Sequence, residues 1–311
     1  MSRRRGTLVA LLAASALLAL HVGWRRRSRP WPEATGWARI PGAPPPRRDF
    51  DLGDGAPLTL DWLGHSGFRL EWHGVRLLLD PQLADRVTIS PRLMERPVAP
   101  GDLGPVDAAL LSHAHRDHLD PATLAAVPEI GTLLLPRGSE GYLTPLPGNV
   151  GRLVGLAPGE RATVGPLEIT AVPVFHHGNR NHPLASAKIA VGYVIRCGAR
   201  AIYFAGDTGA RAPFAEIGAR HHPDLAILPI GSYAPAWPIG RVHLSPEQAV
   251  AAADALGARL VVPCHFGTYT LSLDREDEAL PRFAAAAAAA GLDWAMPELL
   301  RPASGTPRGG R

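Results

Sequence analysis

The stretch Ser112-His113-Ala114-His115-Arg116-Asp117-His118 places three imidazoles and a carboxylate within six positions. It directly follows the apolar run 108–111, which predicts a short buried strand. Alternate residues of an extended segment point the same way, so His113 and His115 can bind one metal ion. The last two residues of the stretch lie where the chain turns and can address a second ion. Imidazole nitrogen and carboxylate oxygen are ligands that Zn²⁺ takes in catalytic sites, which keep a position open for water.

Short apolar runs bounded by Gly, Pro and Asp recur on both sides of this stretch and predict further strands. The clearest helix begins after Ser245, because Pro246 suits the first helical position and Gln248 completes a capping box. The chain thus has a series of strands followed by strands that alternate with helices, which predicts a layered α/β fold with sheets inside and helices outside. The predicted strands are 58–63, 68–72, 75–79, 108–111, 132–135, 167–174, 189–195, 201–204, 225–230 and 260–262.

Further candidate ligands follow predicted strands later in the chain. They are His176, His177, Asp207 and His265. The carboxyl ends of strands are where open α/β sheets build their sites, so we expect these residues to meet the first cluster.

The ligand series His113-x-His115-x-Asp117-His118, His176, Asp207 and His265 resembles that of the metallo-β-lactamase fold. Within this fold the sequence resembles N-acylphosphatidylethanolamine-hydrolysing phospholipase D and its bacterial relatives. The similarity covers nearly all of residues 58–270. The stretches that carry it are Trp62 to Ser66, Ser112 to Asp120, Phe204 to Gly209, Ile230 to Trp237, His243 to Ala249 and His265 to Thr268.

The resemblance implies an αββα sandwich with two central sheets flanked by helices, and two Zn²⁺ ions. The ligand set that it implies is His113, His115 and His176 for one ion, and Asp117, His118 and His265 for the other, with Asp207 bridging. His176 is preferred to His177 because in the family an arginine follows the third ligand by four residues, as Arg180 does here. The same ligands also suit Fe or Mn.

The function implied is a phospholipase D-type phosphodiesterase that acts on N-acylphosphatidylethanolamine-like phospholipids through a metal-bridging hydroxide. Asp117 and Asp207 are the predicted catalytic residues, and Asp80 is a candidate acceptor for a ligand imidazole N–H. Substrate contacts are predicted for His65, Tyr233, Trp237 and His243. The alternative is a lactonase or another small-ester or phosphoester hydrolase of the same fold, similar to L-ascorbate-6-phosphate lactonase.

The formal net charge of +4 is the sum of two unlike parts. Residues 1–48 hold ten arginines and Glu33, a balance of +9, which leaves −5 for residues 49–311. The acidic body offers little attraction for a phosphate backbone, so we expect no nucleic-acid partner. The basic leader predicts contact with a membrane surface that carries the phospholipid substrate. The sequence does not predict an oligomeric state.

The apolar run 7–24 lies between two arginine clusters. As a helix its 18 residues would reach about 27 Å against a hydrocarbon core of about 30 Å. A membrane anchor, a cleaved signal and an interfacial helix remain open. We favour the anchor, because the small residues Ala14 and Ala16 lie inside the run rather than after it.

Four segments are expected along the chain. Residues 1–27 form a membrane anchor or signal segment, 28–57 a Pro/Arg-rich linker, 58–301 the catalytic domain and 302–311 a flexible tail. The expected location is the bacterial inner membrane, held by a single N-terminal anchor, or the periplasm after signal cleavage.

Overall fold

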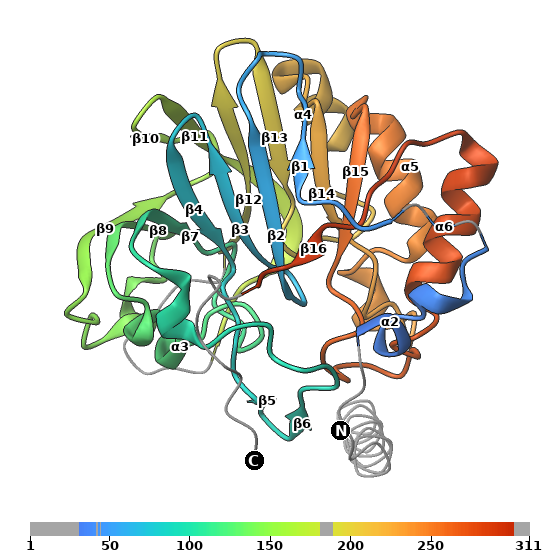
Figure 1. Cartoon of the computed structure of the whole chain (residues 1–311), viewed down its shortest axis with the longest axis horizontal. Helices are drawn as coiled ribbons and strands as arrows, with labels where there is room; N and C mark the ends of the chain where they lie inside the picture. The colour runs from blue at the N-terminus through green and yellow to red at the C-terminus, as the bar shows by residue number, and fades with distance from the viewer. Residues whose placement is uncertain (1–30, 42, 44, 181–188, 302–311) are drawn as a thin grey trace, which may run out of the picture.

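The computed structural model describes residues 31–301, apart from 42, 44 and 181–188. Two β-sheets form the centre of this part of the chain (Figure 1). A small hairpin of β5 (Arg86–Val87) and β6 (Ser90–Pro91) lies apart from both sheets. The expected mixed α/β fold with two central sheets is therefore confirmed.

The first sheet has the order β1-β2-β3-β4-β7-β8-β9, with β16 paired to β2. Strands β2 to β4 form an antiparallel meander, whereas β4, β7, β8 and β9 are parallel. The bounds are β1 (Asp49–Phe50), β2 (Leu58–Gly64), β3 (Gly67–Trp72), β4 (Val75–Leu79), β7 (Val106–Leu110), β8 (Ile130–Pro136), β9 (Val150–Leu156) and β16 (Glu298–Leu299).

The second sheet has the order β10-β11-β12-β13-β14-β15. Its first four strands are antiparallel and its last three are parallel. The pairing of β11 with β12 shifts register between Pro173 and His177, an irregularity of the kind that redirects side chains next to active sites. The bounds are β10 (Arg161–Val164), β11 (Leu167–His177), β12 (Ile189–Cys197), β13 (Arg200–Phe204), β14 (Leu225–Pro229) and β15 (Leu260–Cys264).

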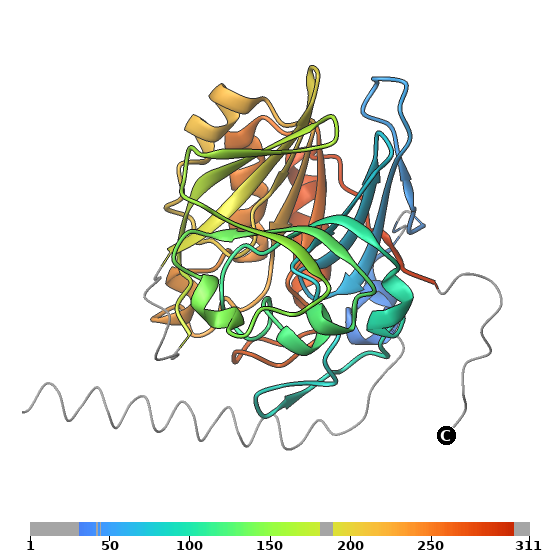
Figure 2. The same cartoon turned by 90° about the vertical axis from the view of Figure 1, so that its left-hand side faces the viewer.

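The two sheets pack as layers, with blue-to-green strands in one and yellow-green-to-orange strands in the other (Figure 2). Strand β4 shows how the sequence builds this arrangement, because its side chains alternate between the two faces of the first sheet. Leu77 and Leu79 belong to the large core that both sheets share. Leu78 belongs to a smaller core on the outer face, together with Leu124 of α3 (Pro121–Ala126).

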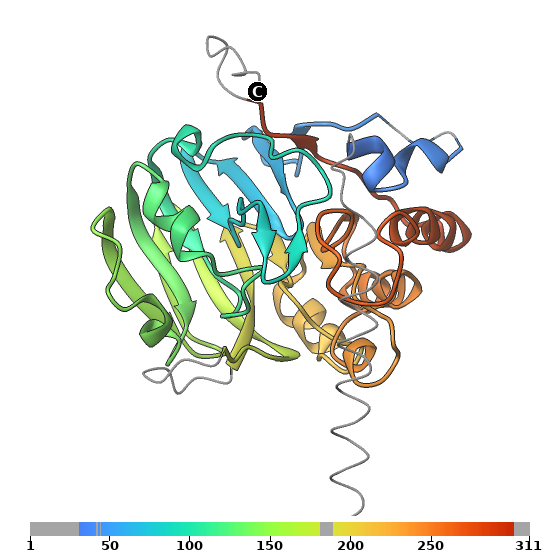
Figure 3. The same cartoon turned by 90° about the horizontal axis from the view of Figure 1, so that it is seen from below.

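Three longer helices cover the outer side of the second sheet, as the view from below shows (Figure 3). The predicted helix is α5, whose capping box is formed: Gln248 N donates to Ser245 Oγ at 3.3 Å, and Ser245 N donates to Gln248 Oε1 at 3.0 Å. The bounds are α4 (Phe214–His221), α5 (Pro246–Leu256) and α6 (Ala279–Ala290).

Thr35 and Arg39, which follow α2 (Trp31–Ala34), contact the body. Thr35 is fully buried, and its side chain lies so close to Gly267 that a Cβ there would approach Thr35 Cγ2 to 2.6 Å. An ion pair of 2.9 Å joins Arg39 to Asp277. The boundary between linker and catalytic domain stays a prediction.

The predicted anchor at residues 1–27 and the tail at 302–311 lie outside the described residues. Within the described ranges, no helix is long and apolar enough to cross a bilayer. The longest is α6, whose 12 residues reach about 18 Å against a hydrocarbon core of about 30 Å. This finding overturns the predicted location in the inner membrane, which we do not maintain.

Candidate metal centre

The candidate ligands come from loops that follow strands of both sheets. The loop after β7 carries the cluster 112–118, and His176 lies near the end of β11. Asp207 follows β13, and His265 directly follows β15. The structure brings all seven predicted ligand residues into two neighbouring groups.

The first group contains His113, His115, His176 and Asp207, whose ligand atoms lie within 4.8 Å of one another. His115 Nδ1 lies 2.9 Å from His113 Nε2 and 3.2 Å from His176 Nε2. His177 is exposed and belongs to neither group.

The second group contains Asp117, His118 and His265, and the structure adds His65 to it. Asp117 Oδ2 lies 3.5 Å from His118 Nε2 and 3.4 Å from His265 Nε2.

Asp207 lies between the two groups. Its Oδ2 atom is 3.1 Å from His265 Nε2 and 3.3 Å from His118 Nε2. On the other side the same atom is 3.8 Å from His113 Nε2 and 3.9 Å from His176 Nε2. A carboxylate in this position can serve two ions at once.

The buried polar atoms show that these residues fit metal ions. Nε2 of His118, Nε2 of His265 and Oδ1 of Asp207 are buried without a hydrogen-bond partner among the described residues. Leaving such a group unsatisfied costs about 1–3 kcal/mol, and more if it is charged. Imidazole nitrogens and carboxylate oxygens are the donor set of dinuclear zinc, iron or manganese sites. Ions bound here would satisfy all three atoms.

Outer hydrogen bonds orient three of the imidazoles. Nδ1 of His118 lies 2.7 Å from Asp80 Oδ2, and Nδ1 of His176 lies 3.0 Å from the Val242 carbonyl. Nδ1 of His113 lies 2.9 Å from Ser112 Oγ. Each contact directs the opposite nitrogen, Nε2, toward the centre, as outer partners do in metal sites. Asp80 therefore occupies the position expected for an acceptor of a ligand N–H.

In the second group, carboxylates and imidazoles shift one another's pKa values. Burial alone would lower the pKa of His265, but the nearby carboxylates of Asp207 and Asp117 raise it to about 9. Burial is likewise outweighed at His118, whose pKa lies well above the usual range because of Asp207, Asp117 and Asp80. Burial opposes ionisation of Asp117 and Asp207, yet the neighbouring imidazoles hold the pKa of both far below normal.

The pKa values of the first group shift differently, because this group contains one carboxylate and three imidazoles. Burial, reinforced by His118, His115 and His176, holds the pKa of His113 well below its usual value. Burial lowers the pKa of His176 to about 3 despite the attraction of Asp207. Both rings are therefore neutral at pH 7 and ready to act as ligands.

Gly206 permits the close approach of two ligand loops. It has a left-handed φ of +57°, and a Cβ at this position would lie 2.3 Å from Ser112 Cβ. Only glycine avoids both the strain and the clash. The Gly206-Asp207 pair therefore lets the loop after β13 reach the loop that carries His113.

The predicted substrate contacts lie in different surroundings. His243 Nε2 is 3.3 Å from Asp207 Oδ2, with Nδ1 at 2.9 Å from the Ile239 carbonyl. His65 Nε2 is 3.0 Å from Asp117 Oδ2. Tyr233 is half-buried, with the Arg282 guanidinium 4.6 Å from its ring centre, and Trp237 is 65% exposed. The two histidines contact the centre, and the roles of the two aromatics stay predictions.

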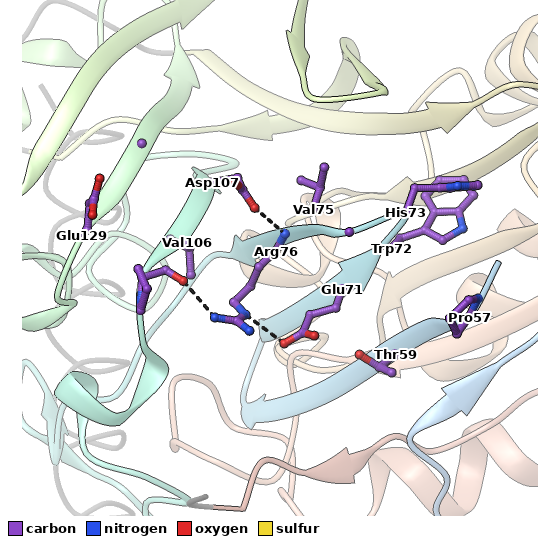
Figure 4. Close-up of a pocket in the computed structure, with 13 residues that line it drawn as sticks. Pro57, Thr59, Glu71, Trp72, His73, Val75, Arg76, Val106, Asp107 and Glu129 are labelled. Carbon is purple, nitrogen blue, oxygen red and sulfur yellow. Dashed lines mark hydrogen bonds and ion pairs between the residues drawn. The ribbon is translucent and has the colours of Figure 1, made fainter.

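Separate from this centre is a cavity of about 670 Å³ on the first sheet (Figure 4). Arg76 spans it, with Nε 2.8 Å from Glu71 Oε1 and its backbone N 2.7 Å from Asp107 Oδ2. Asp107 lies in the first half of β7, whereas the ligand cluster follows its last residue, a strand length of about 17 Å away. None of the residues that line the cavity belongs to either ligand group.

Comparison with known proteins agrees with this geometry. Residues 75–266 match the family described as Beta-lactamase superfamily domain. An uncharacterized protein of Mycobacterium tuberculosis is 36% identical over 277 residues, which cover 84% of this chain and 73% of that protein. A UPF0173 metal-dependent hydrolase of Caldivirga maquilingensis is 32% identical, with 68% and 82% covered.

A more distant relative and two solved structures are also similar to this chain. N-acyl-phosphatidylethanolamine-hydrolyzing phospholipase D 1 of Caenorhabditis elegans is 29% identical, covering 69% of this chain and 65% of its own length. The structure of a metal-dependent hydrolase from Parabacteroides distasonis matches with a TM-score of 0.56, at 21% identity, covering 81% of this chain and 98% of its own. An isothiocyanate hydrolase from Delia radicum gut bacteria matches with a TM-score of 0.61, at 23% identity, covering 76% and 95%. Because these identities are low, the two structures support the fold alone.

Proposed function

The chain belongs to the metallo-β-lactamase superfamily and is a metal-dependent hydrolase, and from this premise we propose that it is a phospholipase D-type phosphodiesterase. Its proposed substrates are N-acylphosphatidylethanolamine-like phospholipids. The observation that carries the proposal is the pair of ligand groups that share Asp207. Two divalent ions bound there would supply Lewis-acid stabilisation of a phosphodiester and lower the pKa of water to near neutrality.

Asp117 is suited to orient the attacking water. Its side chain is 14% exposed, whereas those of Asp207 and His118 are almost fully buried, so it lies nearer the solvent side of the centre. Because its pKa lies far below normal, it is ionised at pH 7 and can accept a hydrogen bond from the attacking water.

The charges beside the centre suit an anionic substrate. Arg116 is exposed between two ligand residues. Arg180 is half-buried, and its pKa is lowered by burial and by the nearby charge of Arg116. Two guanidinium groups close to each other beside the ligands would attract a phosphodiester, although the body as a whole is acidic. The C. elegans relative, whose name states this activity, supports the same substrate class.

The test is hydrolysis by the purified full chain after reconstitution with Zn²⁺ or Mn²⁺. Substrates are N-acylphosphatidylethanolamine in mixed micelles, a water-soluble phosphodiester and a small lactone. We expect release of phosphatidic acid from the lipid and its loss in Asp207→Ala, whereas His73→Gln, at the far end of β3, keeps the activity. Hydrolysis of the lactone alone would replace the proposal with the lactonase alternative. Full activity in Asp207→Ala would reject the mechanism.

A further inference from the structure

His65 joins ligand loops that come from the two different sheets. It lies in the turn between β2 and β3, with a left-handed φ of 54°. Its backbone is bonded to the loop that carries a ligand after β15: His265 N donates to His65 O at 3.1 Å, and His65 N donates to Thr268 Oγ1 at 2.6 Å. The position of His65 is therefore fixed relative to His265.

The side chain of His65 points to the ligand cluster of the first sheet. Its Nε2 atom lies 3.0 Å from Asp117 Oδ2, and the residue is 2% exposed. Its ring centre is 4.0 Å from that of His265 and 5.5 Å from that of Tyr269. Arg92 holds Tyr269 in turn, with Nη1 3.0 Å from the hydroxyl oxygen. His65 thus keeps a left-handed backbone and is held by contacts with the surrounding residues. This combination at a functional site is typical of a strained conformation kept for its function.

Within the second group, the hydrogen bonds distinguish a donor from a ligand. Nε2 of His118 and of His265 has no hydrogen-bond partner among the described residues, which is expected of atoms that bind an ion. Nε2 of His65 has one, because Asp117 Oδ2 accepts from it. Within the described part of the chain, Nδ1 of His65 has no partner to receive a proton. Its proton therefore belongs on Nε2, and His65 acts on Asp117 rather than directly on a metal.

We infer that His65 is a positioning residue of the metal centre, which donates its Nε2–H to Asp117 and holds that carboxylate in place to bind the second ion. The inference deepens the proposed function and rests on its dinuclear centre. It adds to the site an outer residue for which the sequence predicted a substrate contact instead. Outer partners of this kind change metal affinity by about 10- to 100-fold when removed.

The test compares variants that keep or remove the donor at similar volume. His65→Met removes it, and His65→Gln retains an N–H at similar reach. The matched control is His73→Met, because His73 also has a left-handed φ, of 49°, and lies 3.0 Å from a carboxylate, that of Asp54. Zinc affinity is measured by chelator competition on the full chain, without substrate, so a wrong substrate assignment cannot affect the result.

We expect His65→Met to lower the affinity of one of the two ions by about 10- to 100-fold. His65→Gln should recover most of this affinity, and His73→Met should match the wild type. Equal affinity in His65→Met and wild type would overturn the inference, as would equal losses in the Met and Gln variants or equal loss of both ions.

A second measurement needs no variant and applies even if His65→Met does not fold. In ¹⁵N-labelled wild-type protein, the inference predicts that Nε2 of His65 stays protonated before and after zinc is added. A change to the Nδ1-protonated tautomer on zinc binding would show that His65 is a ligand and would reject its role as a donor.

Discussion

Asp80 Oδ2 lies 2.7 Å from His118 Nδ1, and both side chains are completely buried. The same carboxylate accepts hydrogen bonds from the backbone N of Ser112, at 2.7 Å, and from its hydroxyl, at 2.5 Å. Asp80 directly follows β4, the last strand of the meander, so it connects the first sheet to the ligand loop after β7.

Asp80→Asn should weaken metal binding at the second group by about 10- to 100-fold, because the amide no longer supports the basicity and orientation of His118. Isothermal titration with Zn²⁺ measures the change. Asp107→Asn is the control, since Asp107 also accepts from a backbone N, that of Arg76, but near the start of β7, away from the ligand loop. Equal affinities in the two variants would show that Asp80 has no such role.

Metal binding should release protons at pH 7. The pKa of His118 is raised and that of His265 is about 9, so both rings are in the positively charged imidazolium form in the metal-free protein. A ligand imidazole must be neutral, so each ring has to lose a proton when the metal binds. Zinc affinity should therefore increase as the pH rises from 7 toward 9. Calorimetry in buffers of different ionisation enthalpy counts the protons. A heat independent of the buffer would contradict the prediction.

Gly206→Ala should destabilise the fold more than Gly198→Ala does. Both glycines have nearly the same φ, +57° and +55°, so the backbone strain of about 1–2 kcal/mol is shared. At Gly206 the added Cβ meets Ser112, whereas none of the described residues lies within 4 Å of the added Cβ at Gly198. Urea denaturation should show a further loss of about 1–3 kcal/mol in Gly206→Ala, by analogy with overpacking. Equal losses would mean that the loop adjusts freely.

Trp237→Ala tests the predicted contact with the lipid. Because the side chain is 65% exposed, the free energy of unfolding should change by less than about 0.5 kcal/mol. KM should rise for N-acylphosphatidylethanolamine and stay constant for a water-soluble phosphodiester. An unchanged KM for both substrates would remove Trp237 from the substrate site.

The sequence predicted the parts of the fold that depend on local patterns. Strand β4 could be recognised because its apolar residues lie between a Gly and an Asp, and α5 because Ser245 and Gln248 form a capping box. Strand β9 was missed, because Gly151, Arg152 and Gly155 interrupt its apolar pattern and much of it is only half-buried.

The ligand cluster was predictable because four of its residues are neighbours in sequence and the other three lie at the ends of apolar strands. The contact of His65 with Asp117 was not, because 52 positions separate the two residues and only the packing of the sheets brings them together. The acceptor at Val242 was also missed, since a backbone carbonyl leaves no residue-type signal. The N-terminal apolar run predicted a location that the described helices do not support.

Metal content in three proteins tests the central claim most directly: the wild type, His115→Ala and Asp207→Ala, each dialysed against a low concentration of free Zn²⁺ and analysed by mass spectrometry. Two groups that share Asp207 predict two ions per chain in the wild type, one in His115→Ala and fewer than one in Asp207→Ala. A single ion in the wild type, or two ions retained in Asp207→Ala, would contradict a dinuclear centre built around this carboxylate.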